Sequence, residues 1–442
     1  MRPFGADDWS EAVLNRPLTT GDEIRTGVGA RSELHSGGAA IRLDAETGLS
    51  LSMLSSAVAR LKLTGGAASI HIYDLDEGEE FFVEAPFATV SLLRTGVYRI
   101  DAWPSFTRIA VNSGAAEIAG VVVRQGQQGR VASGAQAEIK DGLPPEDALD
   151  RYALARDRRE APSLAAKRVP PRLIGRDDLD EHGEWTQDPS YGWIWAPRAV
   201  AVDWAPYRFG HWVWISPWGW TWIDDAPWGF APFHYGRWVT VRGRWCWIPG
   251  PFHRHPVYAP ALVVFAGGGG PGFHFYFRLS GGPGVAWFPL GPREVWHPPY
   301  RASRVYVTNV NVRNTVIRRD VDIHRIDMAK QRYAHRETAF TAMPEEAFRG
   351  ARPVRNQSVR VEGREARAAR PTGSAAPPRP REPRPVARPA PAPRAEPRTR
   401  SAEESRRDRQ WEQRTTRETE KRTRQVETER RRVEPRESKS RR

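Results

Sequence analysis

The sequence predicts a mainly β protein: a β-sandwich or solenoid-like region, then a repeat of tryptophan-rich β-hairpins, then a disordered tail rich in Arg and Pro. Three observations carry this prediction. Short alternating segments recur about every ten residues over residues 1–138, tryptophans recur in a fixed pattern over residues 183–300, and Pro, Arg and Ala dominate from about residue 352. Frequent Gly and Pro, 38 of each in 442 residues, favour turn-rich β structure.

Residues 1–138 are predicted to form short strands joined by glycine-containing turns. Apolar and polar residues alternate at residues 59–63 and again at 69–72, with Gly65-Gly66 between them as an expected turn. Short strands at this spacing are typical of a β-sandwich, barrel or solenoid-like sheet, because alternate side chains then face one core.

Residues 139–182 are predicted to be a helical connector. Pro144 and Pro145 suit the first turn of a helix, and the acidic Glu146 and Asp147 complement the positive end of its dipole. We expect one charged helix at residues 148–160.

The tryptophans define the next region, residues 183–300. Thirteen of the 18 tryptophans fall between Trp185 and Trp247, in units that read Gly-x-Trp, a short gap, and Trp-x-Trp. The units begin at Gly183, Gly210 and Gly236, at spacings of 27 and 26 residues. A fixed period indicates one supersecondary unit that is copied and stacked. Each unit is predicted to be a β-hairpin with Trp side chains paired across the strands.

The remaining segments give weaker patterns. A looser fourth copy of the repeat is expected from Gly272 to Trp287. Residues 301–350 are predicted to hold edge strands, at 304–308 and 310–312, and then short helices. Residues 351–442 are predicted to be a disordered basic tail, with a charged helix at 402–434 as one alternative.

The charge of the chain is confined to this tail. The net charge is +14, and residues 351–442 alone hold 28 Lys or Arg and 14 Asp or Glu, so residues 1–350 are formally neutral. The overall basicity therefore does not indicate a basic groove on the folded region or a specific nucleic-acid partner. The lone Cys246 excludes an intramolecular disulfide and a cysteine-based metal site, and we expect it to be a packed side chain. No apolar run approaches the ~20 residues of a membrane helix.

Two stretches of the chain resemble known bacterial families. The first region resembles the FecR-like domain of envelope proteins, at residues 14–22 (LNRPLTTGD), 31–34 (RSEL), 40–43 (AIRL), 85–89 (APFAT), 95–100 (TGVYRI) and 124–128 (RQGQQ). The repeat region, with residues 218–232 (WGWTWIDDAPWGFAP) and 285–294 (VAWFPLGPRE), resembles a Trp-rich domain of unknown function that proteobacterial proteins carry after such a domain.

The resemblance implies an exported protein of Gram-negative bacteria, periplasmic or extracellular, and implies no activity. Residues 1–8 contain no apolar signal-peptide core, and the first FecR-like strand is missing, so we expect a truncated start. The transmembrane segment of FecR-type signal transducers is also missing from this sequence.

Three aromatic side chains are the candidate ligand-stacking residues: Trp218, Trp228 and Tyr235. Most tryptophans of the repeat are expected to form the core, since short hairpins bury little area otherwise and one Trp buries about 200 Å². These three lie at predicted turns and ends, where exposed rings would stack on the C–H face of a sugar.

Other chemistry is weakly indicated. Asp224 and Asp225 are a carboxylate pair, but adjacent acids in a strand point to opposite faces, which disfavours a glycosidase dyad. The candidate zinc ligands are His253 and His255, together with His234 or His274. Their spacing does not match a known zinc-binding motif. We therefore expect no catalytic residue, cofactor or metal.

The function that these observations favour is a non-enzymatic, exported cell-envelope protein with a structural or ligand-binding role, glycan being one candidate ligand. Peptidoglycan or another envelope polyanion is the expected partner, through the Trp repeats or the Arg-rich tail. A FecR-type signalling component and a polysaccharide-active enzyme are the alternatives. The oligomeric state is not predicted.

Overall fold

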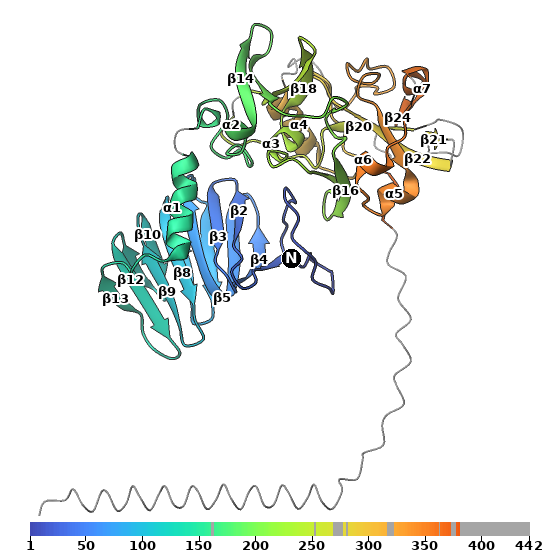
Figure 1. Cartoon of the computed structure of the whole chain (residues 1–442). Helices are drawn as coiled ribbons and strands as arrows, with labels where there is room; N and C mark the ends of the chain where they lie inside the picture. Colours follow the sequence, from blue (N-terminus) through green and yellow to red (C-terminus); the bar gives the residue numbers. More distant parts are fainter. Residues whose placement is uncertain are drawn as a thin grey trace, which may run out of the picture. The chain divides into compact units, whose positions relative to one another are not determined.

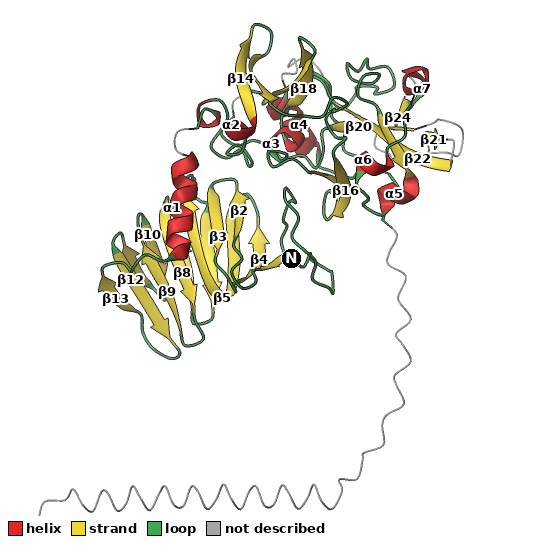
Figure 2. Cartoon of the chain, viewed as in Figure 1, coloured by secondary structure: helices red, strands yellow, loops and turns green. Residues whose placement is uncertain are grey.

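The computed structural model describes residues 1–160, 163–251, 253–267, 277–279, 282–315, 322–361, 363–372 and 377–380. These residues belong to one compact unit, Met1–Arg381. As predicted, the described part of this unit is mainly β (Figures 1 and 2). The fourth hairpin copy is expected to begin at Gly272, which lies outside the described residues. The charged helix expected at 402–434 lies wholly outside them.

The first region is a two-layered β-sandwich. Its strands are β1 (Glu23–Arg25), β2 (Ser32–Ser36), β3 (Ala39–Leu43), β4 (Gly48–Leu54), β5 (Val58–Ile72), β6 (Glu80–Ala85), β7 (Ala88–Leu92), β8 (Gly96–Ala102), β9 (Phe106–Val111), β10 (Ala115–Ile118), β11 (Val121–Arg124), β12 (Gln127–Ala132) and β13 (Glu138–Asp141). One layer contains β1, β4, β6, β7, β10 and β11, the other contains β2, β3, β8, β9, β12 and β13, and β5 runs through both. Inward-facing apolar side chains of both layers form one core.

The long strand β5 corrects one prediction. Gly65-Gly66 is not a turn between two strands, because the strand continues through both residues. Gly66 has a φ of +85°, and a Cβ there would lie 2.2 Å from the side-chain oxygen of Thr47. The glycines therefore let one strand bend from the first layer into the second, a role that glycine has at sharp bends of sheets.

Helix α1 (Ala148–Glu160) has the bounds predicted from the sequence, and ion pairs hold it against the sandwich. Only Leu149 and Ala153 are buried apolar residues in it. At its start, the guanidinium of Arg99 in β8 lies 2.6 Å from Asp147 and 2.7 Å from Asp150. Further along the helix, other ion pairs join it to β2 and β3. A helix with so few apolar side chains is thus held mainly by ion pairs with buried partners.

All three predicted hairpins are present. They are β14 (Gly183–Asp188) with β15 (Gly192–Pro197), β16 (Gly210–Ile215) with β17 (Gly219–Asp224), and β18 (Arg237–Val241) with β19 (Arg244–Ile248). In each hairpin the first Trp of the unit lies opposite the last Trp of the unit, in the pairs Trp185–Trp195, Trp212–Trp222 and Trp238–Trp247. The sequence repeat is therefore a repeat of one cross-strand register.

The leading glycine of each unit makes room for the last indole. A Cβ on Gly183 would lie 2.1 Å from the ring of Trp195, and one on Gly210 would lie 2.7 Å from the ring of Trp222. A Cβ on Gly236 would lie 2.5 Å from the indole nitrogen of the third unit's last Trp. The Gly-x-Trp pattern thus has a steric cause. The indole excludes a side chain at Gly183, and at Gly210 and Gly236 the indole does so together with the backbone carbonyl oxygens of Ile223 and Ile248, which would lie even closer, at 2.2 and 2.1 Å.

The hairpins are not stacked in chain order, which corrects the expected array. The first and third hairpins join in one sheet of order β14-β15-β19-β18, while β16 and β17 pair only with each other. Trp212 of the second hairpin packs instead on Phe265 and Trp287, with ring centroids 5.0 and 5.4 Å apart. Those two rings lie on a further sheet of β20 (Val263–Gly267), β21 (Phe277–Leu279), β22 (Gly282–Pro289), β23 (Thr341–Pro344) and β24 (Arg370–Pro371).

The edge strands expected at 304–308 and 310–312 are wrong, because α4 (Arg304–Asn314) occupies this segment. The Ser303 side chain caps the helix by accepting a hydrogen bond from the backbone N–H of Tyr306. Val307 and Val310 are buried, whereas the other valines of the segment are exposed, which is helical and not strand periodicity. Tertiary burial has overridden the strand propensity of valine.

The ordered region extends past residue 350, where the tail was expected to begin. The short helical elements of the described chain are η1 (Ala165–Lys167), α2 (Leu179–His182), α3 (Ala231–His234), α5 (Glu345–Arg349), α6 (Val354–Gln357) and α7 (Gly363–Ala368). Val354 and Ala366 are buried, so α6 and α7 have their own apolar contacts. The Arg-rich composition of this segment does not predict that these two apolar residues are buried.

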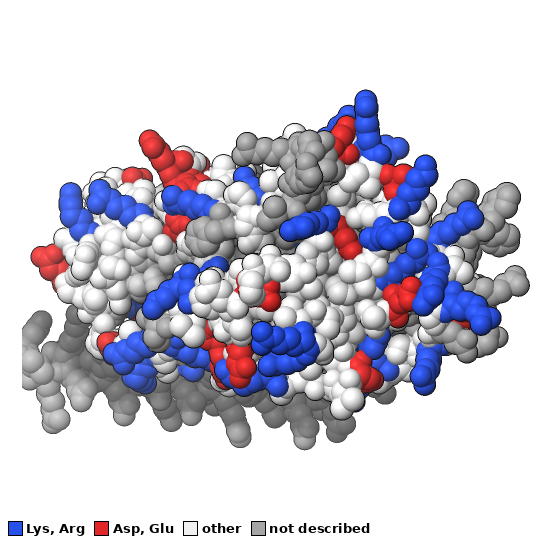
Figure 3. All heavy atoms as spheres, turned by 90° about the horizontal axis from the view of Figure 1, so that it is seen from above, with Lys and Arg blue, Asp and Glu red and all other residues white. Residues whose placement is uncertain are grey.

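The surface of the described region mixes both signs of charge. Figure 3 shows Lys and Arg interspersed with Asp and Glu over the face drawn there. This agrees with the formal neutrality of residues 1–350. Within the residues described, no helix has the length and apolar character needed to cross a membrane.

Candidate functional site

The three aromatic residues predicted to stack on a ligand lie in different environments. Trp228 is 4% exposed and Tyr235 is 3% exposed, so the expectation that they project into solvent is wrong. The chain between the second and third hairpins turns inward through α3, and both rings join the aromatic core. Trp218 is half-buried and packs on Tyr258, with ring centroids 4.7 Å apart. Of the three, Trp218 alone keeps an accessible face.

The side chains considered for acid–base or thiol chemistry are separated or buried. Asp224 is 2% exposed and accepts a hydrogen bond from the Trp222 indole at 3.0 Å, and burial raises its pKa well above the ordinary value. The neighbouring Asp225 has a side chain 59% exposed, so the two carboxylates do not face one cleft. Cys246 is buried, as expected, and burial raises the pKa of its thiol.

The candidate zinc ligands do not converge. His234 is completely buried, and burial lowers its pKa to about 4. His255 lies instead 3.0 Å from the carboxylate of Asp76 on the β-sandwich, His253 is half-buried, and His274 lies outside the described residues. Among the residues that the structure describes, no group of three or more His, Cys, Asp or Glu is placed to hold a metal ion.

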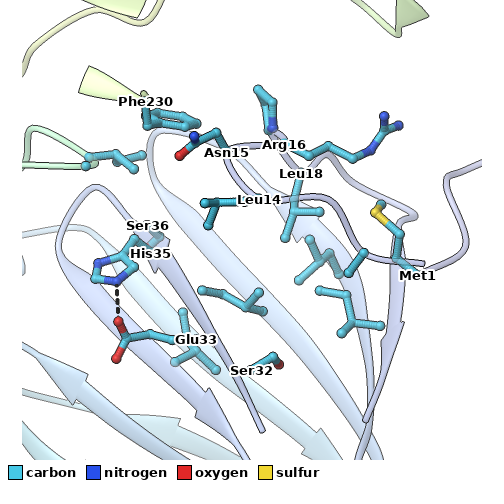
Figure 4. Close-up of a pocket in the computed structure, with 18 of the residues that line it drawn as sticks. Met1, Leu14, Asn15, Arg16, Leu18, Ser32, Glu33, His35, Ser36 and Phe230 are labelled. Carbon is cyan, nitrogen blue, oxygen red and sulfur yellow. Dashed lines mark hydrogen bonds and ion pairs between the residues drawn. The ribbon is translucent and has the colours of Figure 1, made fainter. Parts of the chain in front are cut away.

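A cavity of about 810 Å³ lies at one edge of the β-sandwich (Figure 4). Residues 12–18 cover it, strands β2, β4 and β5 form its walls, and Trp218, Phe230 and Tyr258 of the Trp-rich region line one side. Small-molecule sites commonly enclose about 300–1,000 Å³. This cavity is therefore the candidate functional site.

The topology of the sandwich explains why a cavity forms there. Strand β4 pairs with the first half of β5 and β3 pairs with the second half, so these two strands leave β5 in different layers. The outer strands β1 and β2 pair with β4 and β3 respectively, and β1 has one further bridge, between Glu23 and Arg2. This edge is closed by the segment preceding β1, in which Met1 packs into the core.

Most of the cavity wall is apolar. Six of the lining side chains come from the covering segment and from both layers of the sandwich: Leu14, Leu18, Ile24, Leu34, Leu51 and Phe81. Figure 4 shows Leu14 and Leu18 reaching from the covering segment between the Glu33–His35 pair on one side and Met1 on the other. A wall of this kind recognises an apolar group by burying its surface, at about 25 cal/mol per Å².

On one side of the cavity, the carboxylate of Glu33 already accepts several hydrogen bonds. Glu33 accepts hydrogen bonds from His35 at 2.9 Å, from Arg42 at 2.6 Å and from Arg156 of α1 at 3.0 Å. Burial by itself would raise the pKa of Glu33, but these hydrogen bonds outweigh it and hold the pKa well below its usual range. Glu33 is therefore anionic and has its charge compensated within the protein.

Three other polar groups on the wall lack such compensation. The Nε of Arg16, the Oγ of Ser32 and the Oη of Tyr258 are buried without a hydrogen bond to any described residue. Asp178 also lines the cavity, and burial raises the pKa of its carboxyl group, although the charges of His35, Arg156 and Arg159 partly offset this. Buried polar atoms are normally paired, so an unpaired set around one cavity is typical of a binding site.

Sequence patterns do not predict this site. Its residues are spread from the first position to Tyr258 and share no spacing, and Trp218 alone among them is a sequence-predicted candidate. The cavity depends on how β3 and β4 leave β5, which is a tertiary property.

Comparison with known proteins finds one family and a few solved structures. Residues 176–294 match the model of a family of unknown function (DUF6600), about a quarter of the chain. Two crystal structures of a candidate anti-sigma factor from Parabacteroides distasonis ATCC 8503 are similar, each with 19% sequence identity and a TM-score of 0.26. The matches cover 30% and 33% of this chain and 65% and 72% of those chains, so the first spans less than two thirds of its counterpart. No curated protein matches.

Proposed function

We propose that this chain is a non-enzymatic binding protein of the bacterial cell envelope, and that its ligand is an apolar molecule held in the cavity at the sandwich edge. The observation that carries the proposal is the cavity itself: about 810 Å³, enclosed mainly by aliphatic and aromatic side chains, with a few unpaired polar atoms. A wall of that composition offers burial of apolar surface and a small number of orienting contacts.

The envelope location is supported by the FecR-like and Trp-rich resemblances and by the composition of the tail. Residues 351–442 carry twice as many basic as acidic side chains, 28 against 14. Arginine pairs with phosphate and carboxylate groups, so this segment suits peptidoglycan or another envelope polyanion in the periplasm or outside the cell. Trp218 is the one predicted aromatic that remains placed to stack on a sugar.

The cavity proposal is tested by filling the cavity without deleting a contact. Ala59 of β5 lines the cavity, and Ala59→Leu adds three carbon atoms to that space. Binding of the neutral apolar dye N-phenyl-1-naphthylamine should weaken at least tenfold. Ala57→Leu is the matched control, because Ala57 is exposed and does not line the cavity. Equal dye affinity in both variants, with both folded by circular dichroism, would contradict the proposal.

The polyanion partner is tested separately, by sedimentation with purified peptidoglycan. Deletion of residues 352–442 also removes α6 and α7, so the informative truncation begins at residue 382, outside the described unit. Loss of co-sedimentation on this truncation assigns the contact to the tail. Loss with Trp218→Ala and retention in the truncated chain would assign it to the repeat region.

A regulatory role is the second candidate, favoured by the position of the cavity. Its wall is shared between the sandwich and the Trp-rich region, because Leu34 lies on one side and Phe230 on the other. The Asn15 side chain also donates hydrogen bonds to the carbonyl oxygens of Asp224 and Ala226, at 3.0 and 2.7 Å. A ligand at this position would alter those contacts, and hydrogen exchange at residues 12–18 with and without ligand tests this.

A further inference from the structure

We propose that the ligand of this cavity is an anionic amphiphile: one aliphatic chain whose carboxylate or phosphate end pairs with Arg16. This inference rests on the proposed binding function and names the chemical class of its ligand. Three observations carry it, namely a guanidinium without an ion pair, an apolar path that begins beside it, and cations on the opposite side of the cavity that are already paired with carboxylates.

The guanidinium of Arg16 lacks the partner that a half-buried cation normally has. It makes no ion pair with any described carboxylate, and its Nε is buried without a hydrogen bond. The charge that acts on it most is that of Asp22, whose carboxylate already accepts hydrogen bonds from the backbone N–H groups of Phe4 and Thr19. Burial lowers the pKa of Arg16, which shows that the site disfavours an isolated cation. An anion at the guanidinium would relieve this cost with charge-assisted hydrogen bonds.

An apolar path runs from Arg16 into the sandwich. Pro17 and Leu18 follow it in the chain and line the cavity, and Ile24 and Leu51 continue the wall below them. Ile24 and Leu51 are 5% and 4% exposed, so each presents a small apolar surface to the cavity and is otherwise packed in the core. Such a path suits methylene groups and gives no partner for a second polar group along the chain.

The described cations on the opposite side of the cavity already have carboxylate partners. Arg156 donates to Glu33 at 3.0 Å, and Arg176 is paired with Asp177 at 3.1 Å. Figure 4 shows Glu33 and His35 on one side, with Arg16 and Met1 on the other. The arrangement therefore sets a direction, with the anionic head at Arg16 and the end of the chain toward Glu33.

The experiment compares three sixteen-carbon ligands that differ only in the head group, each below its micelle concentration. Palmitate, 1-hexadecanol and hexadecylamine compete with N-phenyl-1-naphthylamine on the full chain and on Arg16→Gln. Palmitate should bind at least about tenfold more tightly than the alcohol, the change that a charge-assisted hydrogen bond gives. Arg16→Gln should abolish this preference while affinity for the alcohol stays unchanged.

Two further variants keep the test decisive. Arg16→Lys should keep a preference for palmitate because it keeps the charge, and Asp178→Asn should leave palmitate binding equal or tighter. Melting temperatures of all variants separate loss of binding from loss of fold. Hexadecyl phosphate and vesicles of anionic phospholipid distinguish the source: a soluble single-chain ligand competes with the dye, whereas binding to a lipid surface appears as co-sedimentation with vesicles in the absence of dye and is insensitive to Arg16→Gln.

The outcomes that overturn this inference differ from those that overturn the binding function. Equal affinity for palmitate and the alcohol, unaffected by Arg16→Gln, refutes the anionic head group and leaves the cavity as a binding site. If hexadecylamine binds most tightly and Asp178→Asn abolishes this preference, the ligand's head group is cationic and pairs with Asp178. Failure of all three ligands and of the dye, with the protein folded, removes the proposed function as well.

Discussion

The steric account of the Gly-x-Trp repeat makes a quantitative prediction for Gly183→Ala. The added methyl group would lie 2.1–2.3 Å from three atoms of the Trp195 indole, far inside van der Waals contact. The ring has little freedom to move, because it is completely buried, its Nε1 donates to the carbonyl oxygen of Leu179 at 2.9 Å, and its neighbour Trp228 lies at a centroid distance of 5.0 Å.

The expected loss of stability follows from three contributions. Overpacking a well-filled core typically costs about 1–3 kcal/mol. Displacing the ring also weakens one buried hydrogen bond, worth about 1 kcal/mol. Alanine also lowers the conformational entropy of the unfolded chain, which raises the free energy of unfolding by roughly 0.4–1 kcal/mol. The free energy of unfolding should therefore fall by about 1–3.5 kcal/mol.

The measurement is a urea titration followed by tryptophan emission, which reports on the Trp-rich region. Gly27→Ala is the control, because a Cβ at Gly27 meets nothing within 4 Å and its φ is not positive. The control should change stability by less than about 0.5 kcal/mol. A double variant with Trp195→Phe should lose less than the two single variants together, since the smaller ring leaves room for the methyl group. Equal midpoints for Gly183→Ala and Gly27→Ala would refute the steric reasoning.

Three further predictions follow from buried polar groups and a helix cap. Burial lowers the pKa of His234 to about 4, below the unfolded value of 6.5. The stability that the neutral imidazole contributes is therefore fully present above pH 6.5, and the free energy of unfolding should fall by about 3 kcal/mol as the pH falls to 4. Chemical denaturation should show that this free energy depends less steeply on pH in His234→Phe. Arg99→Met leaves the buried Asp101 paired with Arg108 alone and releases the start of α1, so we expect a loss of about 1.5–3 kcal/mol and faster hydrogen exchange in that helix; unchanged exchange would argue against the ion-pair clamp. Ser303→Ala removes the cap of α4 and should cost about 0.5–2 kcal/mol by thermal melting, whereas Ser303→Asp should retain most of the stability.

Local sequence patterns predicted the elements whose cause is local. The three hairpins were predicted because the glycine, the paired tryptophans and the turn lie within about fifteen residues of each other. The bounds of α1 followed equally from Pro144, Pro145 and Pro162 on either side of a charged segment. Each of these features acts over a distance that a repeat or a capping pattern can report.

Features that depend on distant contacts were missed. The segment of α4 has strand propensity, and its helical form depends on burial of Asn311, which bonds to both backbone groups of Trp296. Trp228 was expected at an exposed turn, but its surroundings are supplied by Trp195 and Trp204 from other parts of the chain. The cavity is of the same kind, since its wall joins residues that are more than 200 positions apart.

The pairing of the first hairpin with the third has a consequence for how this region tolerates rearrangement. In a linear solenoid, each module rests on its immediate neighbours, and a copy can be removed or added with the rest left intact. Here the contact of Trp195 with Trp247 closes a loop that contains the second hairpin. Excising the first or third copy breaks their shared sheet, and excising the second leaves the Trp287 ring without its Trp212 contact. The region should thus melt in a single cooperative step, and insertions should be accepted at the hairpin tips and not between the copies.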